Sequence, residues 1–184
     1  MVFNSWAFIP FFALTLAGYY LLRDWRWQKA MLLAASYVFY GFFHPPYVLI
    51  LIISTLIDFK LSHWIAASEG RRRKLLLAAS LVSNLGMLAY FKYAGFALEN
   101  FNEALAQLGA TAQLPIWNIV LPVGISYYTF QTLSYTIDVY RRKLPPSRSL
   151  LDFAFFVAFF PQLVAGPIVR ALEFLPQTQE PQRA

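Results

Sequence analysis

Cysteine is absent from the 184 residues, so the chain has no disulfide, no S-acylation site, no thiolate metal ligand and no thiol to carry an acyl group. Charge is scarce as well: Asp, Glu, Lys and Arg make up 13% of the residues, whereas a soluble domain has about 25%. No metal-ligand cluster, phosphate-cradling glycine loop or G-x-S-x-G elbow occurs. Residues 1–5 lack the basic start of a secretory signal, so we expect the first apolar stretch to be retained.

Apolar and aromatic residues dominate what is present. The chain is 59% hydrophobic and 18% aromatic, with 18 Phe and 11 Tyr, as expected where rings anchor at membrane interfaces. The net charge is +6, and most of the Lys and Arg residues lie in three short stretches, residues 23–29, 71–74 and 141–148. Basic clusters beside apolar stretches mark the cytoplasmic side of a membrane protein. The composition therefore predicts an integral membrane protein and argues against a nucleic-acid partner.

Five apolar stretches approach the length of about 20 residues that a spanning helix needs. We predict an all-α, polytopic transmembrane helical bundle of about five spans, at residues 3–22, 27–43, 47–67, 75–91 and 116–139. Pro45 and Pro46 end the second span, because proline cannot continue a helix. With the N-terminus outside, this alternation brings all three basic clusters to the cytoplasmic face.

Two further segments are not expected to cross. Residues 96–108 place Phe and Leu on one helical face, which indicates an interfacial helix on the outer surface; a solvated loop helix is the alternative. Residues 151–164 form a short apolar piece, which Pro161 and then Gly166 and Pro167 break. This pattern predicts a short helix followed by a re-entrant or interfacial turn. The alternative there is an ordinary membrane exit with Arg170 at the head groups. We expect a membrane domain at 1–172 and a polar tail at 173–184.

A polar stripe follows one face of the fifth predicted span. Its members recur at steps of four, three and four residues, which places them on one helical face: Tyr127, Gln131, Ser134 and Asp138. The stripe predicts either the wall of a tunnel for a polar substrate or hydrogen bonding between helices of a larger bundle. Asp138 and Arg142 are spaced to pair.

Asp58 is the other polar group of note, in the inner half of the third span. A buried carboxylate there needs a partner from another span, and structural pairing is favoured over catalysis. The two histidines, His44 and His63, lie near span ends and are poorly placed for catalysis.

Two long motifs carry a family resemblance: LPVGISYYTFQTLSYTIDVYR at residues 121–141 and FFPQLVAGPIVR at residues 159–170. The chain resembles the membrane-bound O-acyltransferase (MBOAT) family, in its alginate O-acetyltransferase-like branch. The resemblance implies transfer of an acetyl group from cytoplasmic acetyl-CoA to hydroxyls of an exported, alginate-like polysaccharide. It also implies a bacterial inner membrane location and periplasmic acetylation proteins as partners.

The resemblance suggests roles for particular side chains. Tyr127, Gln131, Ser134 and Asp138 become tunnel-lining candidates, and a cavity turn would use Gln162, Gly166, Pro167 and Arg170. The family's catalytic histidine lies in a Trp-His-Gly-type stretch, and no such stretch occurs in these residues.

We therefore expect the N-terminal part of an incomplete MBOAT fold, with no catalytic residue, no bound cofactor, no activity alone and a C-terminal half as a possible partner. Two alternatives come from other classes. A small transporter or channel subunit would use the stripe as a permeation path, and a non-catalytic membrane scaffold would dock a periplasmic acetylation enzyme.

Overall fold

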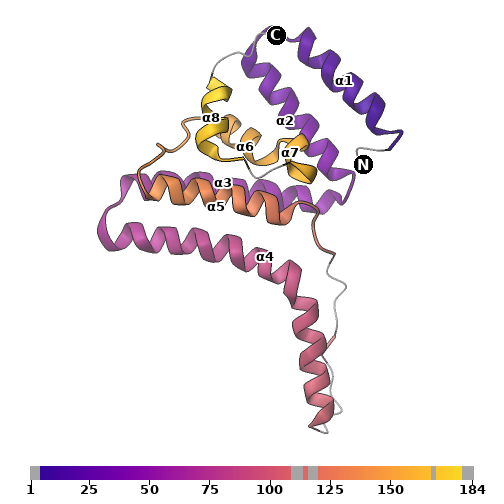
Figure 1. Ribbon diagram of the computed structural model, residues 1–184, viewed down its shortest axis with the longest axis vertical. Coiled ribbons are helices and arrows are strands. Elements are labelled where there is room, and N and C mark those ends of the chain that lie inside the picture. Colours follow the sequence, from indigo (N-terminus) through magenta and orange to yellow (C-terminus); the bar gives the residue numbers. More distant parts are fainter. Residues whose placement is uncertain (1–4, 109–113, 116–119, 167–168, 180–184) are drawn as a thin grey trace.

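A computed structural model describes residues 5–108, 114–115, 120–166 and 169–179. Over these ranges the chain is helical and contains no strand. Figure 1 shows the helices, which in chain order are α1 (Phe8–Leu21), α2 (Trp25–Gly41), α3 (Pro45–Ala67), α4 (Gly70–Gln107), α5 (Ile125–Tyr140), α6 (Leu150–Ala158), α7 (Phe160–Ala165) and α8 (Ala171–Gln179). The all-α prediction is confirmed.

Two helices, α3 and α4, are long and apolar enough to cross a membrane, judged by length and composition. The other predicted spans correspond to shorter helices of 14 residues in α1, 17 in α2 and 16 in α5. These two helices support membrane association, while the number of five spans stays a prediction.

Local sequence explains where these helices begin. Asp24 caps α2, its carboxylate accepting a hydrogen bond from the Arg26 amide at 2.8 Å. Proline opens α3 in its first turn, where the missing N–H costs no helical hydrogen bond. Ser149 caps α6, its hydroxyl accepting from the Asp152 amide at 3.2 Å.

The predicted fifth span differs from the structure at its start. The helix begins at Ile125 rather than at residue 116, and residues 120–124 ahead of it are not helical. Gly124 takes φ +77°, a left-handed conformation that interrupts any helix running into α5 and that glycine adopts without strain. Pro122 therefore lies before the helix and does not kink it. Residues 116–119 of the predicted span lie outside the described residues.

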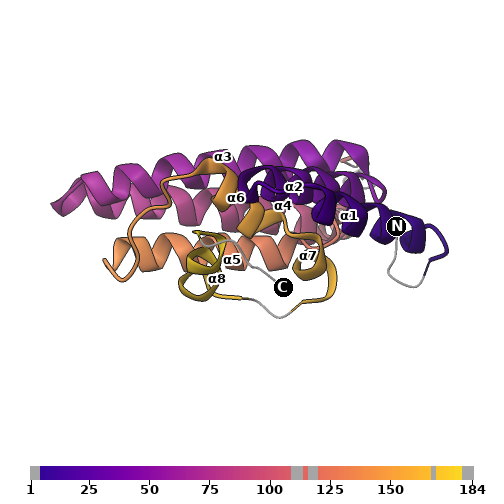
Figure 2. The same cartoon turned by 90° about the horizontal axis from the view of Figure 1, so that it is seen from above.

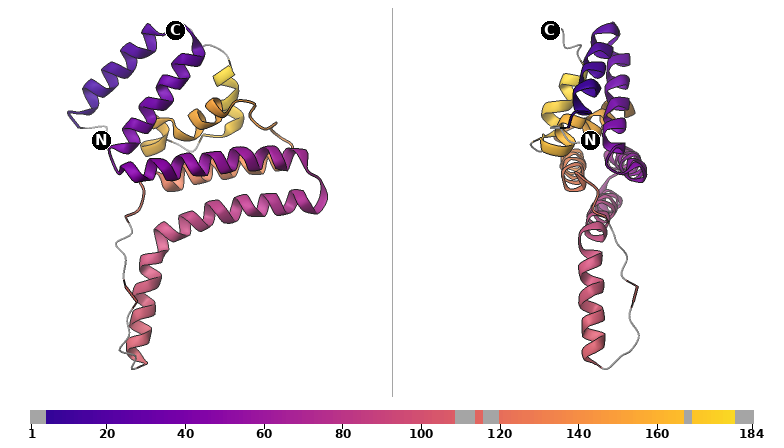
Figure 3. Two further views of the ribbon diagram at one scale, coloured as in Figure 1. Left: turned by 180° about the vertical axis from the view of Figure 1, so that it is seen from behind. Right: turned by 90° about the vertical axis from the view of Figure 1, so that its right-hand side faces the viewer.

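A second difference concerns α4. The predicted span 75–91 and the predicted interfacial helix 96–108 belong to one continuous helix of 38 residues. The helix bends partway, and its second part extends away from the other helices (Figures 1 and 3). Near its end the Asn102 carboxamide donates to the Leu114 carbonyl and accepts from the Leu114 amide, at 2.9 and 2.8 Å. This pair of bonds fastens the returning chain to the extended part of α4.

The core forms where α3, the first part of α4 and α5 pack side by side. Helices α2 and α6 pack against α3. Helices α6, α7 and α8 pack against α5. Figure 2 shows α7 and α8 lying on the side of α5. Buried aromatic rings fill the centre, with Tyr135 and Phe153 at 4.6 Å between ring centroids. This packing brings segments far apart in the sequence onto α5.

Helix α8 also joins this packing. Thr178 of α8 is buried, and its carbonyl accepts hydrogen bonds from Trp25 Nε1 at 2.7 Å and Lys29 Nζ at 3.0 Å. Lys29 in turn forms an ion pair with Asp152 of α6. Residues 173–179 are thus helical and in contact with α2, while the predicted domain boundary at 172 stays a prediction.

Candidate functional site

The motifs at residues 121–141 and 159–170 meet where the start of α5 contacts α7. A Cβ added to Gly124 would lie 2.3 Å from the Leu163 carbonyl oxygen, so the two backbones touch at this point. Two turns into α5, the buried Gln131 donates from Nε2 to Gln162 Oε1 of α7 at 3.4 Å. The close approach requires glycine at position 124, and it places two carboxamides face to face.

The segment around α7 is built from interrupted backbone. Phe159 separates α6 from α7, and Pro161 stands in the first turn of α7, where proline is tolerated. Gly166 ends α7, its amide donating to the Gln162 carbonyl at 3.2 Å, and a Cβ there would lie 2.6 Å from Gln162 Cα. Gly166 therefore lies directly against Gln162. Pro167 falls outside the described residues.

The remaining members of the predicted stripe do not converge with Gln131 and Gln162. Tyr127 is 39% exposed, and Ser134 is half-buried, donating to the Gln131 carbonyl of its own helix at 2.8 Å. Asp138 is half-buried near the far end of α5, and Arg170 is exposed before α8. The role of these side chains as a tunnel lining stays a prediction.

The predicted pairing of Asp138 with Arg142 is wrong. Arg142 has left the helix, with φ +59°, and its guanidinium pairs with Glu69 at 3.3 Å. Beside it, the buried Arg73 donates to the Tyr140 carbonyl at 2.6 Å and to the Val139 carbonyl at 3.2 Å. Two of the three basic clusters therefore meet at the end of α5.

A second polar face of α5 escaped the sequence reasoning and is buried more deeply. Its members have exposed fractions of 0%: Tyr128, Thr129, Thr132, Tyr135 and Thr136. The hydroxyls of Thr129 and Thr136 have no hydrogen-bond partner among the described residues. The hydroxyls of Tyr128 and of Tyr40 in α2 interact with each other. The spacing of the three threonines by three and four residues was a readable signal for this face.

Asp58 of α3 is fully buried where α3, α4 and α5 pack together, and it connects to this second face of α5 through Asn84. Its carboxylate accepts hydrogen bonds from Ser80 Oγ at 2.9 Å and from Asn84 Nδ2, which is 2.9 Å from each oxygen. Thr132 of α5 then donates to Asn84 Oδ1 at 3.1 Å. The partners of the carboxylate come from another helix, as a buried acid requires, and they are neutral amide and hydroxyl groups.

The Tyr135 hydroxyl connects the buried polar side chains between α3 and α5 to the loop that follows α5. The Tyr135 hydroxyl lies 3.2 Å from Ser62 Oγ of α3 and accepts a hydrogen bond from the Ser147 amide at 2.9 Å. The loop at 144–149 is thus held by a side chain buried between helices.

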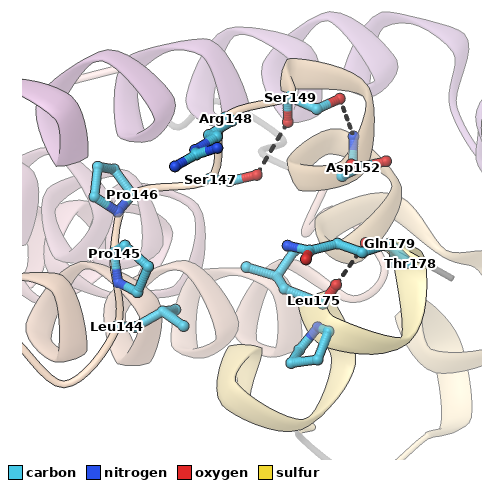
Figure 4. Close-up of a pocket in the computed structure, with 11 residues that line it drawn as sticks. Leu144, Pro145, Pro146, Ser147, Arg148, Ser149, Asp152, Leu175, Thr178 and Gln179 are labelled. Atoms are coloured by element: carbon cyan, nitrogen blue, oxygen red, sulfur yellow. Dashed lines mark hydrogen bonds between the residues drawn. The ribbon is translucent and has the colours of Figure 1, made fainter.

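The same loop forms one wall of a pocket of about 600 Å³ (Figure 4). Leu144, Pro145 and Pro146 follow one side, and α8 forms the other side with Leu175, Pro176 and Thr178. The pocket is open at the surface and lies apart from the Gln131–Gln162 contact.

Neither histidine belongs to these sites. His44 is exposed ahead of α3, with its ring 5.3 Å from that of Tyr47. His63 Nδ1 lies 2.8 Å from the Phe59 carbonyl of its own helix. The described parts of the chain hold no group of three or more His, Cys, Asp or Glu that could bind a metal. The described arrangement can therefore orient polar groups through amides and hydroxyls.

Over the described residues, two helices of spanning length and apolar composition, together with a buried polar layer, support membrane association. Comparison with curated proteins identifies the class more closely. The chain is 38% identical over 179 residues to a probable alginate O-acetylase of Pseudomonas aeruginosa, which covers 96% of this chain and 34% of the relative. A probable alginate O-acetylase of Azotobacter vinelandii is 37% identical over 179 residues, covering 96% and 36%.

A peptidoglycan O-acetyltransferase of Helicobacter pylori is 30% identical over 210 residues, covering 98% of this chain and 39% of the relative. No family model and no solved structure matches the chain. These relatives confirm the resemblance to the alginate O-acetylase-like branch of the membrane-bound O-acyltransferases. The chain spans about a third of the length of the curated relatives that it matches.

Proposed function

We propose that the chain forms part of a multi-pass O-acetyltransferase in a bacterial inner membrane, which moves acetyl groups from cytoplasmic acetyl-CoA to hydroxyls of an exported, alginate-like polysaccharide. The observation that carries the proposal is 38% identity to an alginate O-acetylase over 96% of the chain. The relatives' names differ in the acceptor polymer and agree on O-acetylation. That agreement supports the type of reaction more strongly than the choice of sugar.

The proposed topology has five spans with the N-terminus outside. The contacts of the basic residues support it: Arg73 binds the end of α5, Arg142 pairs with Glu69, and Lys29 joins α2 to α6 and α8. The contacts of Arg73 and Arg142 bring the second and third basic clusters together where α5 ends, and those of Lys29 place the first cluster against α6 and α8. Positively charged loops are retained on the cytoplasmic side, so the end of α5 would face the cytoplasm.

Because the chain has no native cysteine, single-cysteine variants can test this topology directly. Lys143 and Glu99 are both exposed, and they lie on opposite sides of the membrane in the proposed arrangement. A membrane-impermeant maleimide applied to intact cells should label Glu99→Cys and leave Lys143→Cys unlabelled until the cells are opened. Labelling of both, or of Lys143→Cys alone, would refute the orientation.

Helix lengths explain why irregular backbone would lie within the membrane. The 16 residues of α5 rise about 24 Å, less than the ~30 Å hydrocarbon core, so the non-helical residues 120–124 would complete the crossing. Non-helical backbone at that depth is tolerated where protein covers it, and α7 covers Gly124. The Gln131–Gln162 pair beside this junction would line the passage for a polar acceptor.

The base that removes the proton from the acceptor hydroxyl would come from outside these 184 residues. A general base must come within hydrogen-bond reach of that proton. His44 and His63 both lie away from the Gln131–Gln162 contact and interact with their own helix or its first residues. The role of this chain would therefore be to shape the passage and orient the substrate.

A chimera tests the proposal. The matching segment of the Pseudomonas aeruginosa relative is replaced by this chain, and the acetyl content of exported alginate is measured in cells lacking the native gene. We expect acetylation to be restored, and Gln131→Leu to lower it because a buried carboxamide is replaced by an apolar group. A chimera that reaches the membrane in normal amounts but acetylates nothing would contradict the proposal.

Lys60→Gln is the matched control for Gln131→Leu. Lys60 is exposed on α3, so its replacement should leave acetylation unchanged. Equal losses in the two variants would show that the chimera is merely sensitive to substitution. Solute flux through liposomes that hold this chain alone would instead favour the channel alternative.

A further inference from the structure

The pocket between the loop at 144–149 and α8 has a fixed shape. The loop is held from below by the Tyr135 hydroxyl, which accepts from the Ser147 amide at 2.9 Å. The opposite wall is held by Trp25 and Lys29, which both donate to the Thr178 carbonyl. A volume of about 600 Å³ lies within the range of small-molecule sites, roughly 300–1,000 Å³.

Charge in the pocket is positive. Asp152 lines it, but the Lys29 ion pair neutralises that carboxylate. Arg148 also lines the pocket, and its guanidinium makes no ion pair or hydrogen bond with any residue that the structure describes. Figure 4 shows the Arg148 side chain on the loop side of the pocket, beside Ser147 and directed towards Pro146. One positive group therefore remains available for a ligand.

The remaining pocket walls indicate which uncharged chemical group a negatively charged ligand would carry. Leu144, Pro145, Pro146, Leu175 and Pro176 give the pocket a mainly apolar surface around a few polar atoms. An inorganic anion would leave most of this surface without contact. A phosphate ester matches both parts, since guanidinium groups bind phosphate through paired hydrogen bonds and the apolar walls can pack against the uncharged portion.

We propose that this pocket binds a phosphate ester, with the Arg148 guanidinium on the phosphate and the proline- and leucine-lined walls around the uncharged portion. The phosphate can belong to a soluble nucleotide or to the head group of an anionic phospholipid, since the pocket lies beside the basic cluster at 141–148. Phosphate recognition here is independent of acetyl transfer, because binding is measured with neither acetyl donor nor polysaccharide present.

Two arms distinguish the sources, both with the full chain. In detergent, calorimetry compares adenosine 5′-monophosphate with adenosine, which differ by the phosphate alone. In nanodiscs, native mass spectrometry compares the retention of phosphatidylglycerol with that of phosphatidylcholine. Each arm uses the unchanged chain, Arg148→Gln and Lys143→Gln. Lys143 is an exposed cation of the same loop that does not line the pocket.

A soluble ligand predicts binding of the monophosphate but not of adenosine, weakened about tenfold by Arg148→Gln and unchanged by Lys143→Gln. A lipid ligand predicts preferential retention of phosphatidylglycerol with the same dependence on Arg148. Arg148 is exposed, so its replacement should leave the helical circular dichroism intact. Absence of phosphate-dependent binding in both arms, or equal loss in the two variants, would overturn the proposal.

Discussion

Replacement of Asp58 by leucine should destabilise the packing of α3 against α4. The substitution removes the acceptor of Ser80 Oγ and of one Asn84 N–H, and both groups remain buried. An unsatisfied buried donor costs about 1–3 kcal/mol. The lower end applies here, because helices that separate within a membrane find other partners. Two such donors give an expected loss of about 2 kcal/mol, which is about a thirtyfold fall in the folded-to-unfolded ratio.

The assay is reversible unfolding of the purified chain in mixed micelles with increasing SDS, followed by circular dichroism. Asp58→Asn should lose less than Asp58→Leu, because an amide oxygen still accepts from Ser80 or Asn84. Lys60→Ala is the matched control: it lies two residues away, is exposed, and should change stability by no more than about 0.5 kcal/mol. If Asp58→Leu unfolds at the same SDS fraction as the unchanged chain, the carboxylate does not hold these helices together and the reasoning is refuted.

Two further substitutions test other contacts by the same titration. Gly124→Ala should lose about 2 kcal/mol or more, because it combines a left-handed φ with a Cβ placed 2.3 Å from the Leu163 carbonyl, whereas Gly95→Ala in open space within α4 should gain ~0.5–1 kcal/mol. Equal effects at the two glycines would contradict the backbone contact. Lys29→Met should lose about 2 kcal/mol by leaving the partly buried Asp152 unpaired, and the additional change Asp152→Leu should restore at least half of that loss. A double variant no more stable than Lys29→Met would show that the ion pair is not the cause.

The sequence predicted helices well where local signals are strong. The third span, expected at 47–67, corresponds to α3 because proline at its start and an uninterrupted apolar stretch both favour helix. The start of α5 was missed, because periodicity cannot reveal that Gly124 adopts a positive φ against α7. The continuity of α4 was missed as well, since the apolar pattern changes near residue 92 while the backbone stays helical.

The candidate site was predictable in part. The predicted stripe on α5 included Gln131 and the second motif included Gln162, but the contact between them joins residues 31 positions apart and leaves no periodic trace. The buried face that bears Thr132 depends on Asn84 of a different helix, so only the packing reveals it. Periodicity identifies which residues share a face, and tertiary contacts decide which face is buried.

The Tyr135 hydroxyl has a consequence for how this protein would respond to its lipid surroundings. It ties the Ser147 amide to a layer that also includes Ser62, so the loop takes its position from the helices and not from the lipid surface. If α5 spans the membrane as proposed, its tilting in a thinner or thicker bilayer would carry the loop along with it, while the surrounding head groups moved independently. The geometry of the loop would then be preserved across membranes of different thickness, and only its depth relative to the lipid would change.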